Sequence, residues 1–311
     1  MFDWLRYLPI QLRKDQRQTN LARRAYCQGL IPTNIIMGDN KLTIKLARSY
    51  RIWQPVDFGF EKKPQRILPY NRDVLTTTIP NSFSGVVGKG GRWRYSIFLL
   101  REWYFLSPWF GGVQIPVDMD AAVITAPQEK KFENISFFHP RAFESALAEY
   151  LDSRYGTEKH DRGPKYRGPV NWHPVTLNKY ITGVRFDVER VTYTADSEQK
   201  AQLFAFPITK QQFIVFTFPQ HNGGSPTSKI RNTSEIEKMV EATFASIQLE
   251  LGPQTIADCE AVKAICPNMS LTPEFGLLKW PIKIEDVGKA LPEQDKAPPL
   301  PEQDDLHLPN S

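Results

Sequence analysis

The stretch Ser234–Leu251, with the sequence SEIEKMVEATFASIQLEL, decides the class of fold. Ser234 and Glu237 are spaced as a capping box, which is typical of a helix N-terminus. The residues that follow place their apolar members on one helical face, at Ile236, Met239, Val240, Thr243, Phe244 and Ile247. We therefore predict an amphipathic helix over Ser234–Leu251 that covers a β-sheet.

Three strands are expected before this helix. The runs Leu203–Ile208 and Gln212–Phe218 are almost continuously apolar, which favours a hairpin that is covered on both faces. Upstream of them, Val184, Phe186 and Val188 alternate with charged residues, so this strand is expected to have one solvent-exposed face.

The first half of the chain shows a similar order of elements. Leu42, Ile44 and Leu46 alternate with polar residues, as in a half-buried strand, and further strands are expected over Arg92–Phe105, as one long or two paired strands, and over Gly111–Thr125. His139-Pro140 then opens a helix that ends at Gly156. Its apolar face consists of Phe143, Ala146, Leu147, Tyr150 and Leu151.

Composition agrees with a β-rich fold. The 311 residues are 41% hydrophobic and 12% aromatic and include 25 prolines, which suits short strands and many turns. We predict an α+β protein: an antiparallel β-sheet body with two covering amphipathic helices, a basic N-terminal arm and a disordered C-terminal tail.

Charge and Pro content set the expected boundaries. Residues 1–66 carry thirteen Lys/Arg and five Asp/Glu, whereas residues 285–311 carry seven Asp/Glu and two Lys. We assign 1–40 to the basic arm, with a helix over Leu12–Cys27, 41–284 to the body, and 285–311 to an acidic Pro-rich tail that is too poor in apolar residues to fold. The polar stretch 157–168 is an expected boundary between half-domains.

Two levels of resemblance start from particular residues. The hairpin and helix over residues 184–250, with the run EKMVEATFASIQL at 237–249, resemble the closing part of PsbP-like and DcrB-like α/β/α sandwiches. The segments REWYFLSPWFG at 101–111 and FHPRAFE at 138–144 resemble bacterial proteins of no assigned activity. These resemblances imply a bacterial, cytoplasmic protein and transfer no chemistry.

Catalytic motifs are weak in this sequence. The Gly-rich segment 85–91 is followed by strand-like residues instead of Lys-Ser/Thr and a helix, so it favours a turn over a phosphate loop. The histidines are scattered, and no metal site or cofactor is expected. The candidates for a catalytic site assembled from distant residues are His139, His173 and Glu158.

A binding role has its own candidates. Lys89, Arg92, Trp93 and Arg94 combine cations with an aromatic ring, the mixture that tracks a phosphate backbone and stacks on a base. The three cysteines, Cys27, Cys259 and Cys266, are expected to be inert thiols, since their number and spacing do not form a disulfide framework.

The sequence leaves three functions open. The favoured one is a non-catalytic interaction or accessory protein that binds another protein through its sheet edge or loops. The alternatives are a hydrolase or nucleotide-handling enzyme, and binding of nucleic acid or anionic membrane surfaces through the basic arm. Because no signal peptide or spanning segment is apparent, we expect a cytoplasmic location.

Overall fold

The computed structural model describes residues 31–47, 51–53, 76–78, 85–87, 93–106, 113–156, 159–160, 163–164, 166–190, 199–219 and 234–274. The predicted N-terminal helix Leu12–Cys27 and the acidic tail 285–311 lie outside these residues.

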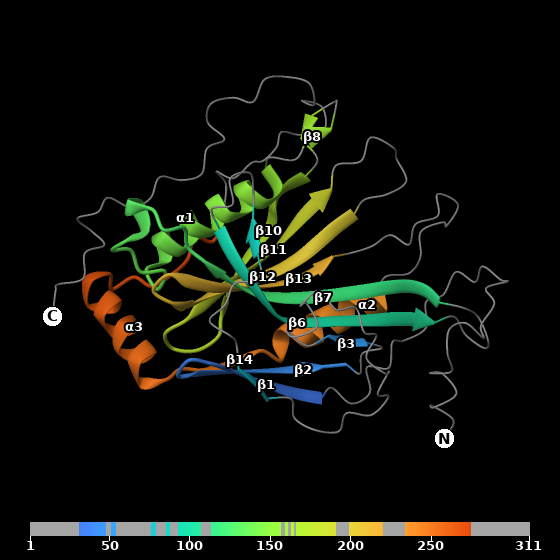
Figure 1. Ribbon diagram of the computed structural model, residues 1–311, viewed down its shortest axis with the longest axis horizontal. Helices are drawn as coiled ribbons and strands as arrows, with labels where there is room; N and C mark the ends of the chain where they lie inside the picture. Colours follow the sequence, from blue (N-terminus) through green and yellow to red (C-terminus); the bar gives the residue numbers. More distant parts are fainter. Residues whose placement is uncertain are drawn as a thin grey trace.

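An eight-stranded antiparallel sheet forms the centre of the molecule (Figure 1). Its main path runs β10-β11-β12-β13-β7-β6-β3, and β5 also pairs with β6. The strands are β10 (Tyr166–Thr176), β11 (Thr182–Arg190), β12 (Gln199–Thr209), β13 (Gln212–Pro219), β7 (Val113–Thr125), β6 (Trp93–Leu106), β3 (Arg51–Trp53) and β5 (Gly85–Val87). Because β13 pairs with β7, strands from before and after the predicted boundary at 157–168 share one sheet.

A smaller sheet packs against one face of the large one. It has the order β14-β2-β1-β4, where β1 is Ile31–Met37, β2 Asn40–Leu46, β4 Thr76–Thr78 and β14 Gln248–Glu250. Only the β1–β4 pair is parallel among the described strands. A separate two-stranded ladder joins β8 (Lys159–His160) to β9 (Gly163–Pro164).

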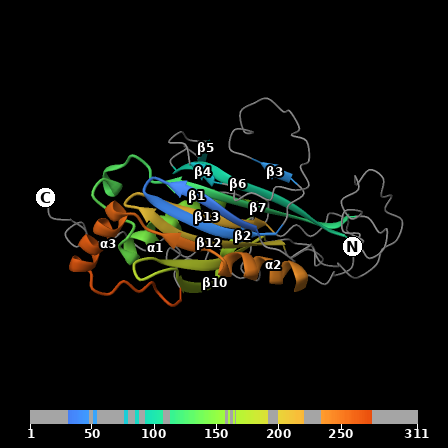
Figure 2. The ribbon, with the colours of Figure 1, turned by 90° about the horizontal axis from the view of Figure 1, so that it is seen from below.

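The helices cover opposite faces of the large sheet. Helix α1 (Pro140–Leu151) packs on one face with Phe143, Leu147 and Tyr150, while α2 (Ser234–Ala245) packs on the other face with Met239, Val240 and Phe244. Figures 1 and 2 show α2 beside the small sheet and α1 on the other side of the large sheet. The predicted α+β class, with an antiparallel sheet and two covering helices, is confirmed.

Both predicted helical stripes are buried. All six residues of the predicted second stripe and all five of the first are buried in the structure. The first helix continues through a π-helical turn, η5 (Asp152–Gly156), and so ends at Gly156 as predicted. A short 3-10 helix, η4 (Lys130–Phe132), precedes α1.

The predicted end of the second helix is wrong. Helix α2 ends at Ala245, and Gln248–Glu250 form the strand β14 beside β2, with Leu249 opposite Leu42. Pairing with β2 satisfies the backbone hydrogen bonds of this segment and buries Leu249, which is 6% exposed.

Two further expectations need correction. Strand β1 lies within the range 1–40 assigned to the arm, so the body includes residues 31–40. The charged face of β11 is only partly exposed: Asp187 is 7% exposed and accepts a hydrogen bond from Asn171, whereas Arg185 and Glu189 keep partly exposed side chains. Helix α2 lies over Arg185 through Glu241, which alternation along the strand cannot reveal.

A third helix, α3 (Pro253–Ile265), was not predicted as an element, and a residue distant in sequence caps it. The β1–β2 hairpin turns at Gly38, whose φ of 63° is readily adopted by glycine. The next residue, Asp39, accepts hydrogen bonds from the backbone N–H of Gln254 at 3.1 Å and from the Thr255 hydroxyl at 3.1 Å. The N-cap position of α3 is Gly252, and the hairpin supplies the side chain that caps the first turn of this helix.

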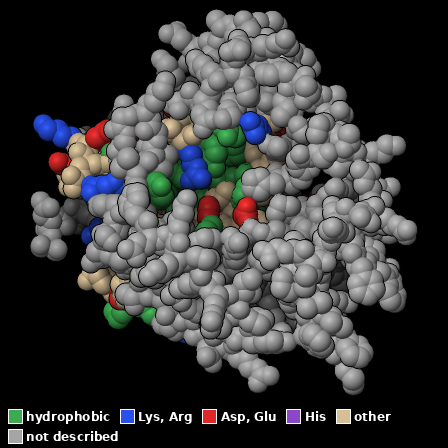
Figure 3. Space-filling view, turned by 45° about the vertical axis from the view of Figure 1, so that its right-hand side comes forward, with side chains coloured by type: hydrophobic (Ala, Val, Ile, Leu, Met, Phe, Trp, Pro, Cys, Tyr) green, Lys and Arg blue, Asp and Glu red, His purple; other side chains and the backbone are tan. Residues whose placement is uncertain are grey.

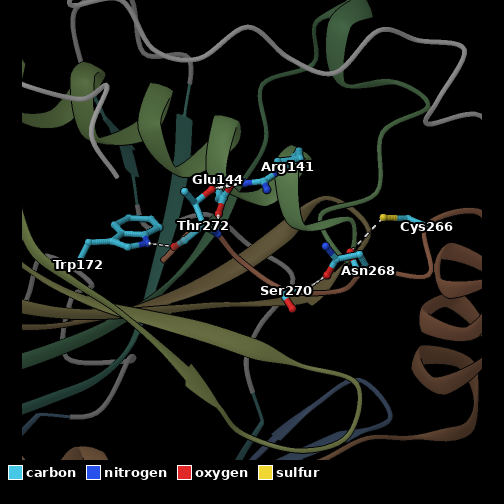
Figure 4. Close-up of polar contacts among 7 residues, drawn as sticks. All are labelled: Arg141, Glu144, Trp172, Cys266, Asn268, Ser270 and Thr272. Atoms are coloured by element: carbon cyan, nitrogen blue, oxygen red, sulfur yellow. Dashed lines mark hydrogen bonds and ion pairs between the residues drawn. The ribbon is translucent and has the colours of Figure 1, made fainter. Parts of the chain in front are cut away.

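Hydrogen bonds hold the segment after α3 against α1 and β10 (Figure 4). The buried carboxylate of Glu144 accepts hydrogen bonds from the backbone N–H and the hydroxyl of Thr272, and Arg141 also pairs with Glu144. On the other side, the indole of Trp172 donates to the Thr272 carbonyl at 2.9 Å. The neighbouring Leu271 is 7% exposed and completes the core beneath α1.

Candidate binding site around Arg154

A cluster of polar and aromatic side chains lies where α1 ends on the large sheet. Arg154 and Tyr155 come from the π-helical turn η5, Asp120 from β7 and Tyr166 from β10. Asp120 shares its sheet face with Ala122 and Ile124, which pack beneath α1. π-Helical turns occur frequently at functional sites because they shift side chains from their regular helical positions.

The guanidinium of Arg154 is the central group of this cluster. Its Nη1 donates a hydrogen bond to the Tyr150 hydroxyl at 2.8 Å, and its carbon lies 5.3 Å from the centroid of the Tyr155 ring. No other hydrogen bond of this guanidinium occurs with the residues that the structure describes. The interaction with Tyr150 and the nearby Tyr155 and Asp120 raise the Arg154 pKa, so the group is cationic at every physiological pH.

Asp120 is half-buried beside this cation. It lies directly opposite Thr217 of β13, whose hydroxyl hydrogen-bonds to its carboxyl group. Burial raises the pKa of Asp120, while the charge of Arg154 acts in the opposite direction. The net upward shift holds a fraction of this carboxyl group protonated at pH values where an ordinary aspartate is ionised.

Aromatic rings complete the site. Tyr155 and Tyr166 meet edge to face at 5.2 Å, and both retain partial exposure. Tyr150 is fully buried and contacts Trp93 at 5.9 Å and Phe213 at 5.6 Å, so the part of the site beneath Arg154 is rigid core. Burial raises the pKa of both Tyr150 and Tyr155, which keeps these phenols neutral.

Charged and apolar side chains are mixed on one face of the molecule. Figure 3 shows hydrophobic, basic and acidic side chains of the described residues close together on this face.

The arrangement around Arg154 suits recognition of an acidic group. The remaining N–H donors of a guanidinium bind carboxylates through two parallel hydrogen bonds, and tyrosine rings add contact area at little entropic cost. Asp120 supplies a carboxyl group that can donate a proton when protonated and accept one when ionised.

The catalytic candidates from the sequence are not brought together. His139 precedes α1 on one face of the large sheet, and its carbonyl accepts the Phe143 N–H at 3.0 Å. His173 is exposed on β10 near α2, where the Glu241 pKa is lowered by its hydrogen bond with Arg185 and by His173. The structure does not place His139 beside His173, and Glu158 lies outside the described residues, so a catalytic role for these three residues stays a prediction.

The four residues predicted to bind a phosphate backbone and a base, Lys89, Arg92, Trp93 and Arg94, have different positions. Trp93 is 0% exposed and meets Phe132, Tyr150 and Phe213 edge to face, so its ring is core and the predicted stacking role is wrong. Arg94 is half-buried on β6. Lys89 and Arg92 lie outside the described residues, and so does the N-terminal arm expected to bind nucleic acid or lipid.

Sequence reasoning missed the Arg154 site, although one signal was present. Asp118 and Asp120 are the charged residues of a mostly apolar strand that ends in AAVIT, at residues 121–125. A carboxylate in the middle of a core strand is costly without a partner, and the partner here comes from a helix end 34 positions later in the chain. Nothing in the local pattern identifies that partner as Arg154.

Other expectations concern cysteines and metals. Cys259 is buried, and burial raises the pKa of its thiol to about 12, as expected of an inert core residue. Cys266 is half-buried, and its thiol contacts the Asn268 carbonyl at 3.2 Å.

Among the described residues no group of three His, Cys, Asp or Glu side chains is placed to hold a metal ion. No helix of the described residues has the length and apolar character needed to cross a membrane.

The edge of the large sheet at β10 is irregular. Its ladder with β11 has register shifts between Arg167 and Val170 and between Val170 and His173, and Asn171 adopts a φ of 56°. Bulges of this kind block the addition of a further strand. Binding of a partner at this edge, one of the expectations from the sequence, is therefore not favoured by the structure.

Comparison with known proteins gives no relative that would assign a function. No family model matches the chain. No curated protein matches it either. The resemblance of residues 184–250 to PsbP-like and DcrB-like sandwiches stays a prediction.

Proposed function

We propose that this chain is a non-catalytic interaction or accessory protein that binds another protein, and that Arg154 receives an acidic group of that partner. The observation that carries the proposal is the half-buried guanidinium of Arg154, which makes one hydrogen bond to a described residue and lies beside Tyr155. We also propose a bacterial cytoplasmic setting, on the basis of the sequence alone.

The composition of the site supports a protein partner. Arginine and tyrosine are enriched among the residues that dominate protein–protein binding energy, especially where they are partly desolvated before the partner arrives. Tyr150 and the core beneath it hold the guanidinium in place, so little side-chain entropy is lost on binding.

Capture from lysate followed by quantitative binding tests this proposal. The full chain and its Arg154→Gln variant are used as baits, and a partner recovered with the full chain is identified and purified. We expect Arg154→Gln to weaken binding of that purified partner at least tenfold, because charge-assisted hydrogen bonds to a carboxylate are lost.

The matched control is Arg167→Gln, which removes an arginine paired with Glu189 at a more exposed position on β10. This variant is expected to bind the partner as the unaltered chain does. Equal binding by Arg154→Gln would remove Arg154 from the interface, and repeated recovery of the bait alone would contradict the interaction function itself. Circular dichroism of each bait establishes that it is folded.

A second candidate function rests on Asp120. Its raised pKa, the adjacent Thr217 hydroxyl and the nearby Arg154 form a polar group assembled from distant parts of the chain, as expected for the alternative of a hydrolase or nucleotide-handling enzyme. Screening of the chain and Asp120→Asn against ester, phosphoester and nucleotide substrates separates the two functions. Turnover that is lost in Asp120→Asn would establish an enzyme, and the absence of turnover in both would favour the binding protein.

A further inference from the structure

The chain leaves the described fold beside the helix that leads to Arg154. The last described residue is Glu274, two positions after Thr272, whose backbone N–H and hydroxyl both bond to Glu144 of α1 (Figure 4). Arg154 is ten positions after Glu144, in the turn that extends the same helix, so the two lie about 15 Å apart along its axis. The C-terminal segment therefore starts on the face of the large sheet that carries the Arg154 site.

The segment that follows Glu274 is acidic and long enough to reach this site. Residues 285–311, the tail, carry seven Asp/Glu and two Lys, and they contain the sequence Leu-Pro-Glu-Gln-Asp twice, at 291–295 and at 300–304. Glu293 is nineteen positions after Glu274, and an extended chain of this length spans about 60 Å. Both copies of the repeat are therefore within reach of Arg154.

Each copy presents two residue types that the Arg154 site fits. The Arg154 guanidinium has one hydrogen bond with a described residue, to the Tyr150 hydroxyl, so its other N–H donors can bind a carboxylate. Its carbon lies 5.3 Å from the centroid of the Tyr155 ring, which meets Tyr166 edge to face, and all three residues are partly exposed. Pro-rich segments bind to aromatic side chains of this kind. In each repeat a proline directly precedes a glutamate, which matches a tyrosine ring beside a guanidinium.

We propose that residues 291–304 bind in cis to the Arg154 site, with a repeat glutamate on the guanidinium and the preceding proline on the tyrosine rings. Covalent linkage gives the tail an effective concentration on the order of 1 mM, which favours the chain's own tail over that of a second copy. The tail then occupies the site that receives the acidic group of the partner, and the partner has to displace it. This regulatory part rests on the proposed function, whereas binding of the tail itself does not.

Photo-crosslinking in the full chain tests where the tail binds. The photoreactive residue p-benzoylphenylalanine replaces Leu300 in the tail, and the crosslinked peptides are mapped by mass spectrometry. We expect crosslinks to residues 150–156 and 166, and at least a tenfold loss of these crosslinks in Arg154→Gln. The control is Arg167→Gln, whose arginine is paired with Glu189, and it is expected to crosslink as the unaltered chain does.

A tail variant separates loss of the contact from loss of the fold, because it leaves every described residue unaltered. Glu293→Gln combined with Glu302→Gln is expected to lose the same crosslinks at least tenfold. A mixture of isotopically light and heavy chains distinguishes crosslinks within one chain from crosslinks between copies. Crosslinks mainly between copies, crosslinks elsewhere or none at all, or unchanged crosslinks in Arg154→Gln or in the tail variant would each overturn the proposal.

Competition with an added peptide tests whether the tail occupies the site. A fluorescein-labelled peptide of residues 291–304, LPEQDKAPPLPEQD, is titrated with each chain and followed by fluorescence anisotropy. A tail at an effective concentration of about 1 mM weakens the apparent binding of a peptide with a Kd of about 100 μM roughly tenfold. We therefore expect the tail variant to bind the peptide about tenfold more tightly than the unaltered chain, and Arg154→Gln to abolish this gain.

Equal affinity of the unaltered chain and the tail variant for the peptide would overturn occupation of the site by the tail. Both assays use the chain without any partner. Their failure is therefore distinguishable from failure of the proposed function, which is measured by recovery and binding of a partner protein.

Discussion

Arg101 and Arg154 lie against the β6–β7 hairpin and have different surroundings. Asp120 stands opposite Leu100 on the face covered by α1, and Arg101 stands opposite Met119 on the other face. Arg154 approaches Asp120 and binds Tyr150, whereas Arg101 has one backbone carbonyl as its described partner. The two arginines therefore lie against opposite faces of one hairpin.

The hydroxyl of Tyr150 is expected to stabilise the fold. Tyr150→Phe keeps the buried ring but removes the acceptor of the Arg154 hydrogen bond. Because the bond involves a charged donor, we expect the free energy of unfolding to fall by about 1–3 kcal/mol. Urea denaturation followed by circular dichroism measures the change.

Tyr180→Phe is the control for this prediction. The Tyr180 hydroxyl donates to Glu260 at 2.8 Å on the surface, so its loss is expected to cost less than about 0.5 kcal/mol. A Tyr150→Phe variant as stable as Tyr180→Phe would show that the contact with Arg154 contributes no net stability.

Asp120 is expected to make stability depend on pH. Its pKa is raised in the folded chain, so the folded state binds its proton more tightly than the unfolded state does. Stability from this group is present below the unfolded pKa and is lost as pH rises through the folded pKa. Asp120→Asn, which stays neutral, is therefore expected to gain stability relative to the unaltered chain between pH 4 and pH 7.

Urea unfolding of both chains at several pH values tests this sign. Asp118→Asn, two residues away on the same strand face, is the comparison for a general effect of negative charge. If the stability advantage of Asp120→Asn over the unaltered chain becomes smaller between pH 4 and pH 7, then attraction to Arg154 affects the Asp120 pKa more strongly than burial does.

At the scale of elements, α3 depends on a hairpin more than 200 residues earlier in the chain. Asp39→Ala removes the acceptor for the Gln254 N–H and the Thr255 hydroxyl. We expect a loss of about 1 kcal/mol, as for other N-cap substitutions, measured by thermal or urea unfolding.

Asp39→Asn is the matched variant, because asparagine keeps a side-chain oxygen and is an equally good cap. It is expected to retain most of the stability that Asp39→Ala loses. Equal losses in the two variants would mean that the charge of Asp39, and not its hydrogen bonds to α3, is responsible.

At the scale of the whole molecule, the large sheet joins the two halves of the chain. Phe213 of β13 lies at its centre and contacts the rings of Trp93, Phe137, Phe143 and Tyr150. Phe213→Ala leaves a cavity among these rings, so we expect a loss of about 3–5 kcal/mol. Since both halves share this core, unfolding is expected to remain a single transition by circular dichroism and tryptophan fluorescence.

Ile265→Ala is the surface comparison, because Ile265 is 41% exposed and its truncation is expected to cost less than about 0.5 kcal/mol. Two separate transitions in Phe213→Ala would indicate that the halves fold independently, in agreement with the boundary that the sequence predicted at 157–168.

The sequence by itself determined the elements with strong local patterns. The stripes of α1 and α2, the alternation of β2 and the apolar runs of β12 and β13 identify type and buried face, because each side chain's direction follows from its position in a helix or strand. The N-terminus of α2 at Ser234 and the end of the first helix at Gly156 were also predictable from local residues.

Tertiary structure decided everything that depends on a distant partner. It turned 248–250 into a strand beside β2, placed α2 against Arg185 of β11, placed the ring of Trp93 in the core and put His139 and His173 on different elements. It also placed Arg154 beside Asp120 and left Arg101 between the sheets. Such pairings arise from packing across the fold, and the local sequence fixes only which side chains are available for them.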